Sequence, residues 1–237
     1  MYTQPVSQNA NYRQSMGKLL MLYTQVDRLI MEICAQRLAE APDEEAELSL
    51  AKQVGDESRH VSIQRQWMLR FDADPAPIIT PEQEQTIREH FRSLPWIDFL
   101  VDLYICVEAL GSEAVERIVP LADPGTRESL RIPLADELDH VAFGVSRLRK
   151  ELARLTRTER QTCLERLPSR IESLTQVFHG FGVPVRRMFE AVGADYDRLC
   201  ELLEDRQKEL IDELAFGKQP PQSGSHHPVQ TMTGISS

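Results

Sequence analysis

The chain has few cysteines, and none is arranged as a metal or redox motif. Its four cysteines, Cys34, Cys106, Cys163 and Cys200, lie far apart and form no C-x-x-C pair. This spacing argues against a disulfide framework and a cysteine-based zinc site, and it favours reduced, buried thiols. The sequence also has no apolar run of about eighteen residues and no basic, apolar leader at its start. We therefore predict a cytoplasmic protein with no membrane partner.

Positive charge is also scarce. Aspartate and glutamate together number 37, against 27 lysines and arginines, which gives a net charge of −10. This balance argues against nucleic acid and anionic membranes as partners, because both carry negative charge. Apolar residues make up 41% of the 237 residues, which is enough for a full hydrophobic core.

No stretch alternates like a β-strand, whereas a helical period recurs along most of the chain. Between residues 11 and 41, the apolar residues Leu19, Tyr23, Ile30 and Cys34 are separated by four or seven positions. That spacing places them on one face of a helix. The fold class predicted from the sequence is therefore all-α. Further helices are predicted from the acidic turn after Pro42 to Phe71, over 80–92, 93–121, 123–154 and 184–216, and from Thr158 with a break near Pro168.

The same pattern predicts the domain organisation. We expect residues 1–10 to form a flexible arm, and residues 217–237, which are rich in Pro, Ser and Gly, to be disordered. Residues 11–216 then form a single helical domain, with a core bundle at about 11–154 and extra helices at about 158–216. Thr80 and Gln83 have the spacing of a capping box that starts the short helix over 80–92.

Two helices carry the same short motif. Asp56-Glu57-Ser58-Arg59-His60 and Asp136-Glu137-Leu138-Asp139-His140 each place a glutamate three residues before a histidine. Residues three apart project from one helix face, so each pair can act together on one ligand. One such pair is weak evidence. Two copies on apolar helix faces predict half of the ligands of a two-metal carboxylate site.

A two-metal site in a four-helix bundle also needs a carboxylate from each of the other two core helices, which are predicted over 11–41 and 93–121. On the first helix Asp27 shares the apolar face, whereas Glu32 has Arg28 and Gln36 as neighbours; Asp27 is favoured and Glu32 stays a possible alternative. On the helix predicted over 93–121, Glu108 lies on the apolar face. The predicted ligands are Asp27, Glu57, His60, Glu108, Glu137 and His140.

The spacing of these ligands indicates an internal repeat. Asp27 precedes Glu57 by 30 residues, and Glu108 precedes Glu137 by 29. Tyr23 and Tyr104 each lie four residues before the first carboxylate of their half. The core is therefore predicted to consist of two helical hairpins of the same design, which together form a four-helix bundle.

Four carboxylates and two imidazoles favour iron or manganese over zinc, and the carboxylates balance two divalent ions in a dry interior. Asp56 and Asp136 are expected to hydrogen-bond the ligand histidines, within or across helices, and to fix their tautomers. Arg59 is expected to balance a buried carboxylate. Tyr23 and Tyr104 can donate hydrogen bonds to the site or serve as core residues. Pro133 predicts a kink or bulge next to the site.

Taken together, these motifs resemble those of the ferritin-like non-haem di-iron carboxylate superfamily. The motif from Asp56 to His60 is similar to the metal-binding motif of bacterial di-iron monooxygenases and acyl-carrier-protein desaturases. The segment from Glu108 to Glu113 is similar to the corresponding segment of ferritin-like tRNA hydroxylases. The chain departs from these patterns at Asp27, where most such oxygenases carry Glu, and at Asp139, where the motif usually has Arg.

The resemblance implies a di-iron oxygenase or oxidase. Such an enzyme holds two iron ions, with manganese as a possible substitute, uses O₂ as co-substrate and oxidises a small organic substrate. Glu57, Glu108 and Glu137 would then be catalytic, with a substrate pocket beside Glu108 and Gly111. An external reductase or ferredoxin-like donor would supply electrons, because the sequence has no flavin or iron–sulfur motif. Helices 158–216 would cover the pocket or form a homodimer face.

The sequence is also compatible with two other classes of function. One is a ferritin-like ferroxidase or iron-handling protein, which a large shell-like assembly would indicate. The other is a helical interaction protein with a vestigial metal site, which a metal-free protein of unchanged stability would indicate. A manganese catalase is a lesser possibility.

Overall fold

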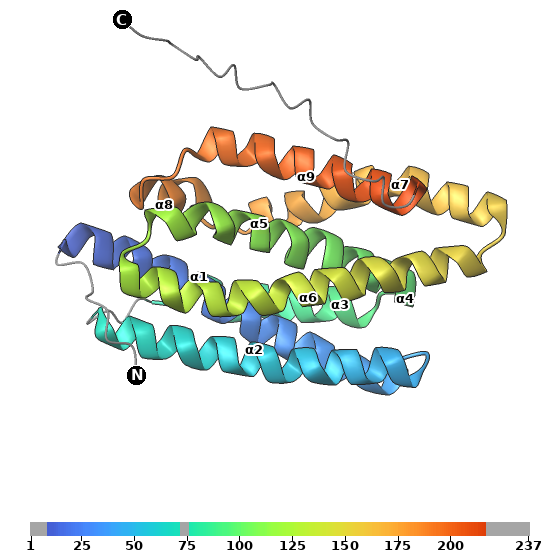
Figure 1. The fold of residues 1–237 in the computed structure, drawn as a ribbon, viewed down its shortest axis with the longest axis horizontal. Helices are drawn as coiled ribbons and strands as arrows, with labels where there is room; N and C mark the ends of the chain where they lie inside the picture. The colour runs from blue at the N-terminus through green and yellow to red at the C-terminus, as the bar shows by residue number, and fades with distance from the viewer. Residues whose placement is uncertain (1–8, 72–75, 217–237) are drawn as a thin grey trace, which may run out of the picture.

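The computed structural model describes residues 9–71 and 76–216, and this part of the chain contains helices and no β-strand (Figure 1). The prediction of an all-α fold is confirmed for these residues. The helices are α1 (Ala10–Arg37), α2 (Glu44–Arg70), α3 (Pro81–Arg92), α4 (Trp96–Leu100), α5 (Ala109–Ile118), α6 (Pro124–Arg154), α7 (Arg157–Gly180), α8 (Val185–Ala191) and α9 (Tyr196–Phe216). Short 3₁₀ turns η1 (Leu38–Glu40) and η3 (Val119–Leu121) follow α1 and α5, and a π-helix, η2 (Val101–Glu108), joins α4 to α5.

Several helices begin at the side-chain caps that the sequence encodes. The Asp43 carboxylate accepts a hydrogen bond from the Ala46 amide at 3.1 Å and caps α2. The predicted capping box at Thr80 and Gln83 is confirmed at the start of α3. Asp123 caps α6, whose first residue is Pro124. Each cap satisfies amide groups that have no partner inside the helix.

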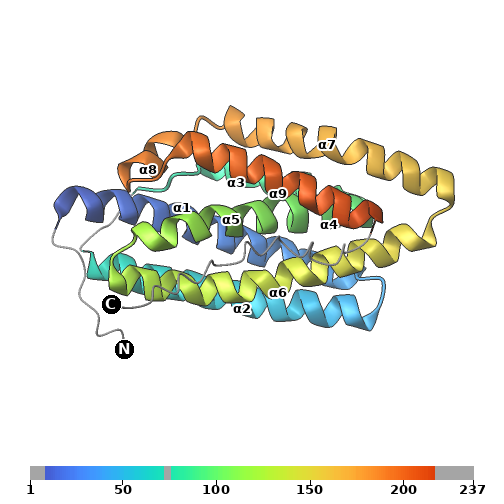
Figure 2. The same cartoon turned by 45° about the horizontal axis from the view of Figure 1, so that its top comes forward.

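The long helices pack as neighbours around a common interior (Figures 1 and 2). α1 and α2 form a hairpin, and α2 also packs against α6. α4, η2 and α5 form one continuous helix, called the third helix below (residues 96–118), which packs against α6. α7 and α9 lie on the side of the third helix that is opposite to α2, and α8 contacts α1 and α9.

The prediction of a break near Pro168 was wrong, and no break occurs at Pro133 either. Pro133 lies inside α6 and Pro168 inside α7, and both helices continue through these residues. A proline removes one backbone hydrogen bond, but packing of the flanking turns against other helices can keep the chain helical. The irregular segment beside the predicted ligands is instead η2, on the third helix.

The C-terminal region also differs from its prediction. A single helix was expected over 184–216, whereas α8 ends at Ala191 and α9 begins at Tyr196. Gly193 has a φ of 94°, which L side chains rarely adopt, and it marks the turn between them. Of the expected N-terminal arm, only residues 9 and 10 are described; Asn9 caps α1 and Ala10 belongs to it. The expected tail, 217–237, lies outside the described residues.

The buried apolar side chains form two clusters at opposite ends of the bundle. One contains Leu29 and Ile33 of α1 with Leu148 of α6; the other contains Leu19 of α1 with Trp67 of α2. On α1, α2 and α6, the predicted ligands lie between residues of the two clusters, and on the third helix Glu108 lies beside Ala109 of the first cluster. The core is therefore interrupted by a polar layer. Among the described residues, no helix combines the length and apolar character needed to cross a lipid bilayer.

Candidate metal centre

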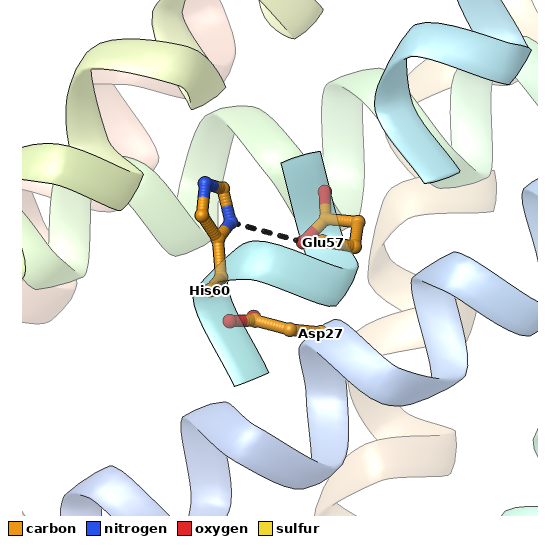
Figure 3. A group of neighbouring side chains, drawn as sticks. All are labelled: Asp27, Glu57 and His60. Atoms are coloured by element: carbon orange, nitrogen blue, oxygen red, sulfur yellow. Dashed lines mark hydrogen bonds and ion pairs between the residues drawn. The ribbon is translucent and has the colours of Figure 1, made fainter. Parts of the chain in front are cut away.

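The structure brings five of the six predicted ligands into two overlapping groups of three. Asp27, Glu57 and His60 form one group, and Glu57, Glu108 and His140 form the other. Within each group, one potential ligand atom of every residue lies within 4.8 Å of the others. All five side chains are buried, and Glu57 is fully so. Figure 3 shows the first group, with Asp27 reaching from α1 towards Glu57 and His60 on α2.

Both histidines turn the same ring nitrogen towards the carboxylates. His60 Nδ1 lies 3.2 Å from Glu57 Oε2, the contact drawn as a dashed line in Figure 3. His140 Nδ1 lies 3.4 Å from Glu57 Oε1 and 3.8 Å from Glu108 Oε2. Glu57 thus has one oxygen facing each imidazole, which is the geometry of a carboxylate shared between two positions.

The opposite ring nitrogens are held by aspartates of the other helix. His60 Nε2 lies 2.9 Å from Asp136 Oδ2, and His140 Nε2 lies 3.2 Å from Asp56 Oδ2. Of the two arrangements left open by the sequence, the one across helices is present. An imidazole that donates its Nε2 proton to a carboxylate leaves the Nδ1 lone pair free for a cation. The crossed pairs therefore prepare both Nδ1 atoms as ligands.

Cationic side chains at the surface pair with the two aspartates that contact the histidines. Arg59 pairs with both Asp56 and Asp136, and Lys52 donates to Asp56 at 3.1 Å. Although burial opposes it, hydrogen bonds from Lys52 and His140 hold the pKa of Asp56 below its usual value. Arg59 was expected to balance a buried carboxylate; it balances these two partly buried aspartates instead, and half of its side chain is exposed.

The π-helix η2 ends at Glu108, the ligand candidate of the third helix. A π-helix has a wider turn than an α-helix and is frequent at functional sites. Here Tyr104 and Glu108, four residues apart, are both buried. Apolar neighbours had pointed to Glu108, but nothing in the sequence indicated a π-helix.

Two buried glutamines that the sequence reasoning missed hold the carboxylates. Gln53 Nε2 donates to Glu108 Oε1, and it lies 3.5 Å from Glu57 Oε1. Gln64 Nε2 donates to Asp27 Oδ2 at 2.7 Å. Both lie on the α2 face that carries Glu57, at steps of four and seven residues. That spacing is the signal in the sequence that indicates them, because residues four and seven positions from Glu57 lie on the same helix face.

Glu137 occupies a different position from Glu57, although both belong to the same motif. It is half-buried and lies outside the two groups of three. It lines a cavity together with Asp27 and Glu108. Burial, with the charges of Glu108 and Glu57, raises the pKa of Glu137 to about 8.

The electrostatics of the cluster favour a bound cation. Burial raises the pKa of Glu108 to about 7, and burial with the charge of Glu57 raises that of Asp27 well above its usual value. Burial by itself would lower the pKa of His60, but its hydrogen bond to Glu57 and the nearby charges raise it to about 9, so a metal ion bound at Nδ1 would displace a proton from this nitrogen. Carboxyl groups this close in a dry interior repel one another, so a divalent cation relieves the repulsion.

One buried atom supports this reading independently. His140 Nδ1 is fully buried and has no hydrogen-bond partner among the described residues, although two carboxylates lie nearby. Buried polar atoms are normally satisfied, so an unsatisfied imidazole nitrogen facing carboxylates fits the role of a cation ligand. Oxygen-rich sites with some imidazole suit iron or manganese. The residues present therefore fit a two-metal carboxylate centre.

The two tyrosines of the repeat are placed differently. Tyr104 donates a hydrogen bond to Gln53 Oε1 at 2.8 Å and packs against Gly144 of α6, where a methyl group would overlap its ring. Tyr23 lies beside the cavity, and its hydroxyl has no hydrogen-bond partner among the described residues. Glu32, the alternative ligand of the first helix, instead pairs with Arg28 at 3.3 Å and Arg88 at 2.6 Å.

A cavity of about 150 Å³ adjoins the cluster. It lies where the sequence placed a pocket, beside Glu108 and Gly111, and Phe189 of α8 is among its lining residues. α8 belongs to the C-terminal region that was expected to cover the pocket or to form a dimer face. The lining residues are Leu22, Tyr23, Val26, Asp27, Ile30, Gln64, Val107, Glu108, Gly111, Ser112, Ala114, Val115, Leu130, Pro133, Glu137 and Phe189.

No protein-family model matches the chain, and no curated protein matches its sequence significantly.

Proposed function

We propose that this protein is a non-haem di-iron oxygenase or oxidase of ferritin-like fold, which uses O₂ to oxidise a small organic substrate. One observation carries the proposal: two buried groups of ligands share Glu57, and the Nδ1 atoms of both histidines face its carboxylate. A two-metal site needs this combination of a shared carboxylate and terminal imidazoles, and a purely structural core does not.

In this proposal Asp27, Glu57, His60, Glu108 and His140 hold two iron ions, or manganese in their place, and Glu137 joins them from the edge of the cavity. The metal pair would supply the electrons that reduce O₂. Glu57, Glu108 and Glu137 would be the catalytic carboxylates: Glu108 and Glu137 line the cavity, and Glu57 belongs to both groups of ligands.

The other residues of the chain position these ligands and exclude water. Asp56 and Asp136 keep a proton on each Nε2, so that Nδ1 stays available. Gln53 and Gln64 orient the carboxylates of Glu108 and Asp27. The largely apolar cavity beside Glu137 would hold a substrate next to the centre.

Electrons must come from a partner in this scheme. Reduction of O₂ consumes electrons, and the sequence contains no flavin or iron–sulfur motif. An external reductase or a ferredoxin-like donor is the corresponding partner, and a small organic molecule is the substrate.

Elemental analysis of the purified protein tests the proposal, together with an anaerobic ferrous titration followed by O₂ exposure under optical monitoring. We expect about two irons per chain and a transient absorbance after O₂ is admitted. Glu32→Ala is the matched control, because Glu32 is an acidic residue of α1 that pairs with arginines, and this variant should bind metal normally.

Other results would overturn the proposal in different ways. Two manganese ions with no response to O₂ would indicate peroxide chemistry. A shell-like assembly of many subunits with iron oxidation would indicate iron handling. A protein that binds no metal, with stability unaffected by added ferrous ion, would leave a helical protein with a vestigial site.

A further inference from the structure

A further buried carboxylate lies on the π-helix η2, six residues before Glu108. The Asp102 side chain is 1% exposed, and it belongs to neither group of candidate ligands. Its partners are basic side chains from outside the two hairpins. His90 Nε2 of α3 lies 2.6 Å from Oδ2, and Arg170 of α7 donates from Nε to Oδ1 at 2.5 Å and from Nη2 to Oδ2 at 2.8 Å. Both carboxylate oxygens are thus engaged, so Asp102 is not available as a metal ligand.

Arg170 also contacts the helix that precedes η2. Its Nη1 lies 3.2 Å from Asp98 Oδ2, and its Nη2 donates to the Asp98 carbonyl oxygen at 3.5 Å. Asp98 belongs to α4, and η2 follows α4 directly. Arg170 therefore spans the point at which the α-helix becomes a π-helix. At the other end of η2, Ser112 Oγ donates to the Glu108 carbonyl oxygen at 2.6 Å, so side chains hold the backbone at both ends.

The conformation of η2 sets the angle between Asp102 and Glu108. A π-helix closes each hydrogen bond over one residue more than an α-helix does, so the angle between residues six apart differs by roughly 100° between the two conformations. Asp102 meets its partners on α3 and α7, whereas Glu108 meets Gln53 of α2. An α-helix over the same residues would turn one of the two carboxylates away from its partners.

Contacts outside the segment must stabilise η2, because a π-helix is rare. On the side of the metal centre, Tyr104 and Glu108 hydrogen-bond Gln53. On the side of α7, which lies opposite to α2 across the third helix, Asp102 provides the contacts. A buried carboxylate that leaves its countercharges is far more costly than an exposed one. Asp102 therefore opposes any rotation of η2 that would take it away from its basic partners.

Without Asp102, the end of η2 that carries Glu108 is the one that would move. The α4 end is held by Phe99 and Leu100, which are buried in the first apolar cluster. The Glu108 carboxyl group instead lies near Glu57 and Glu137, whose negative charges repel it. Loss of the contacts at Asp102 would therefore release the candidate ligand rather than the start of the helix.

We propose that Asp102 is a positioning residue of the candidate metal centre: paired with His90 and Arg170, it keeps η2 in the π conformation and thereby holds the Glu108 carboxylate in its group of candidate ligands. The residues Asp102, His90 and Arg170 are called the Asp102 anchor below. The consequence for metal binding rests on the proposed function. The effect on η2 depends only on contacts within the protein.

Two variants of Asp102 and one matched control test the proposal. Asp102→Leu removes the anchor, and Asp102→Asn, which keeps the shape but not the charge, is the milder second variant. Glu84→Leu is the control, because Glu84 is also a buried carboxylate, 7% exposed, whose partners Arg28 and Arg88 lie on α1 and α3. Both leucine variants lose buried ion pairs, so both should unfold more readily, and circular dichroism shows whether helix content is kept.

Hydrogen–deuterium exchange of the metal-free, full-length protein measures the effect on η2. We expect Asp102→Leu to accelerate exchange over residues 101–112 relative to α2, because opening of this segment no longer breaks the anchor. Asp102→Asn should have the same effect to a smaller degree. Glu84→Leu should leave exchange over 101–112 unchanged.

A titration with Mn²⁺ measures the consequence for Glu108. The two groups of candidate ligands predict a first and a second binding step, and Glu108 belongs to one group only. Asp102→Leu should weaken one step by roughly tenfold and leave the other unchanged, whereas Glu84→Leu should leave both unchanged. Chelator competition gives the affinities, and electron paramagnetic resonance distinguishes isolated from exchange-coupled ions. General destabilisation would not weaken one step alone.

The outcomes separate this inference from the proposed function. Unchanged exchange over 101–112 in both Asp102 variants would overturn the inference, as would equal weakening of the two binding steps or accelerated exchange with both affinities kept. Accelerated exchange confined to 101–112 in a protein that binds no metal would support the effect of the anchor on η2 and overturn the di-iron proposal. About two metal ions per chain with unchanged exchange would do the opposite.

Discussion

The two helical hairpins have the same ligand spacing, but they differ in helix geometry and in how deeply their ligands are buried. In the first hairpin, α1 and α2 are α-helices, and Asp27, Glu57 and His60 are all buried in one group. In the second, the π-helix η2 brings in Glu108, while Glu137 stays half-buried at the cavity. A repeated motif therefore gives equivalent positions along the chain without giving equivalent environments.

Residues at equivalent positions around the motif account for much of this difference. Four before the glutamate stands Gln53 in the first hairpin and Pro133 in the second; seven after it stands Gln64 in the first and Gly144 in the second. The two glutamines hydrogen-bond carboxylates. Pro133 borders the cavity and Gly144 admits the Tyr104 ring. The first hairpin thus supplies amide side chains that hold the ligands, whereas the second leaves room for the cavity and for the Tyr104 ring.

The largest expected effect separates Glu57 from Glu137. Glu57→Ala should reduce bound metal from about two ions per chain to none, because this carboxylate belongs to both groups of ligands. Glu137→Ala should retain part of the metal. Elemental analysis after metal loading measures this, with circular dichroism to show that helix content is kept. Equal losses in the two variants would contradict the asymmetry.

The next effect tests the close approach at Gly144. Gly144→Ala should lower the free energy of unfolding by roughly 1–3 kcal/mol, because the added methyl group would overlap the Tyr104 side chain. Gly55→Ala, on the exposed face of α2, is the control and should raise stability by up to about 1 kcal/mol through helix propensity. Urea denaturation measures both. Two stabilised variants would mean that the third helix and α6 do not pack this closely.

A third prediction concerns the supporting amide of the first hairpin. Gln53→Leu should weaken metal binding by roughly 10–100-fold, since Gln53 contacts Glu57, Glu108 and Tyr104 without being a ligand. Competition with a chelator of known affinity gives the change. Unaltered affinity would show that these carboxylates need no support from Gln53.

The smallest expected effect is a difference in unfolding free energy between variants of the two tyrosines. Tyr104→Phe should cost about 1 kcal/mol of unfolding free energy, because Gln53 Oε1 loses its donor in a buried place. Tyr23→Phe should cost close to nothing in the ligand-free protein, since its hydroxyl has no partner among the described residues. Denaturation curves of both variants test this. A larger loss for Tyr23→Phe would reveal a hydrogen bond that the structure does not contain.

Local patterns predicted most of the helices and the faces that they bury. The three-and-four spacing of apolar residues in α1 and α2, and the caps at Asp43, Thr80 and Asp123, depend on neighbours in sequence, so they can be read without the fold. Pro168 misled the prediction because the cost of a missing hydrogen bond competes with packing from distant helices. The glutamines were missed because the predicted site contained carboxylates, histidines, an arginine and two tyrosines but no amide side chain, although Gln53 and Gln64 share the helix face of Glu57.

By itself, the sequence determined that the chain is helical and that Glu57, His60, Glu137 and His140 stand at matching positions of two helices, since helical geometry fixes which residues share a face. Only the tertiary structure decided that each histidine meets the aspartate of the other helix, and that Glu57 is shared while Glu137 borders a cavity. These contacts join residues about eighty positions apart. Such pairings depend on how helices rotate and pack against one another, and the local period of one helix carries no information about that rotation.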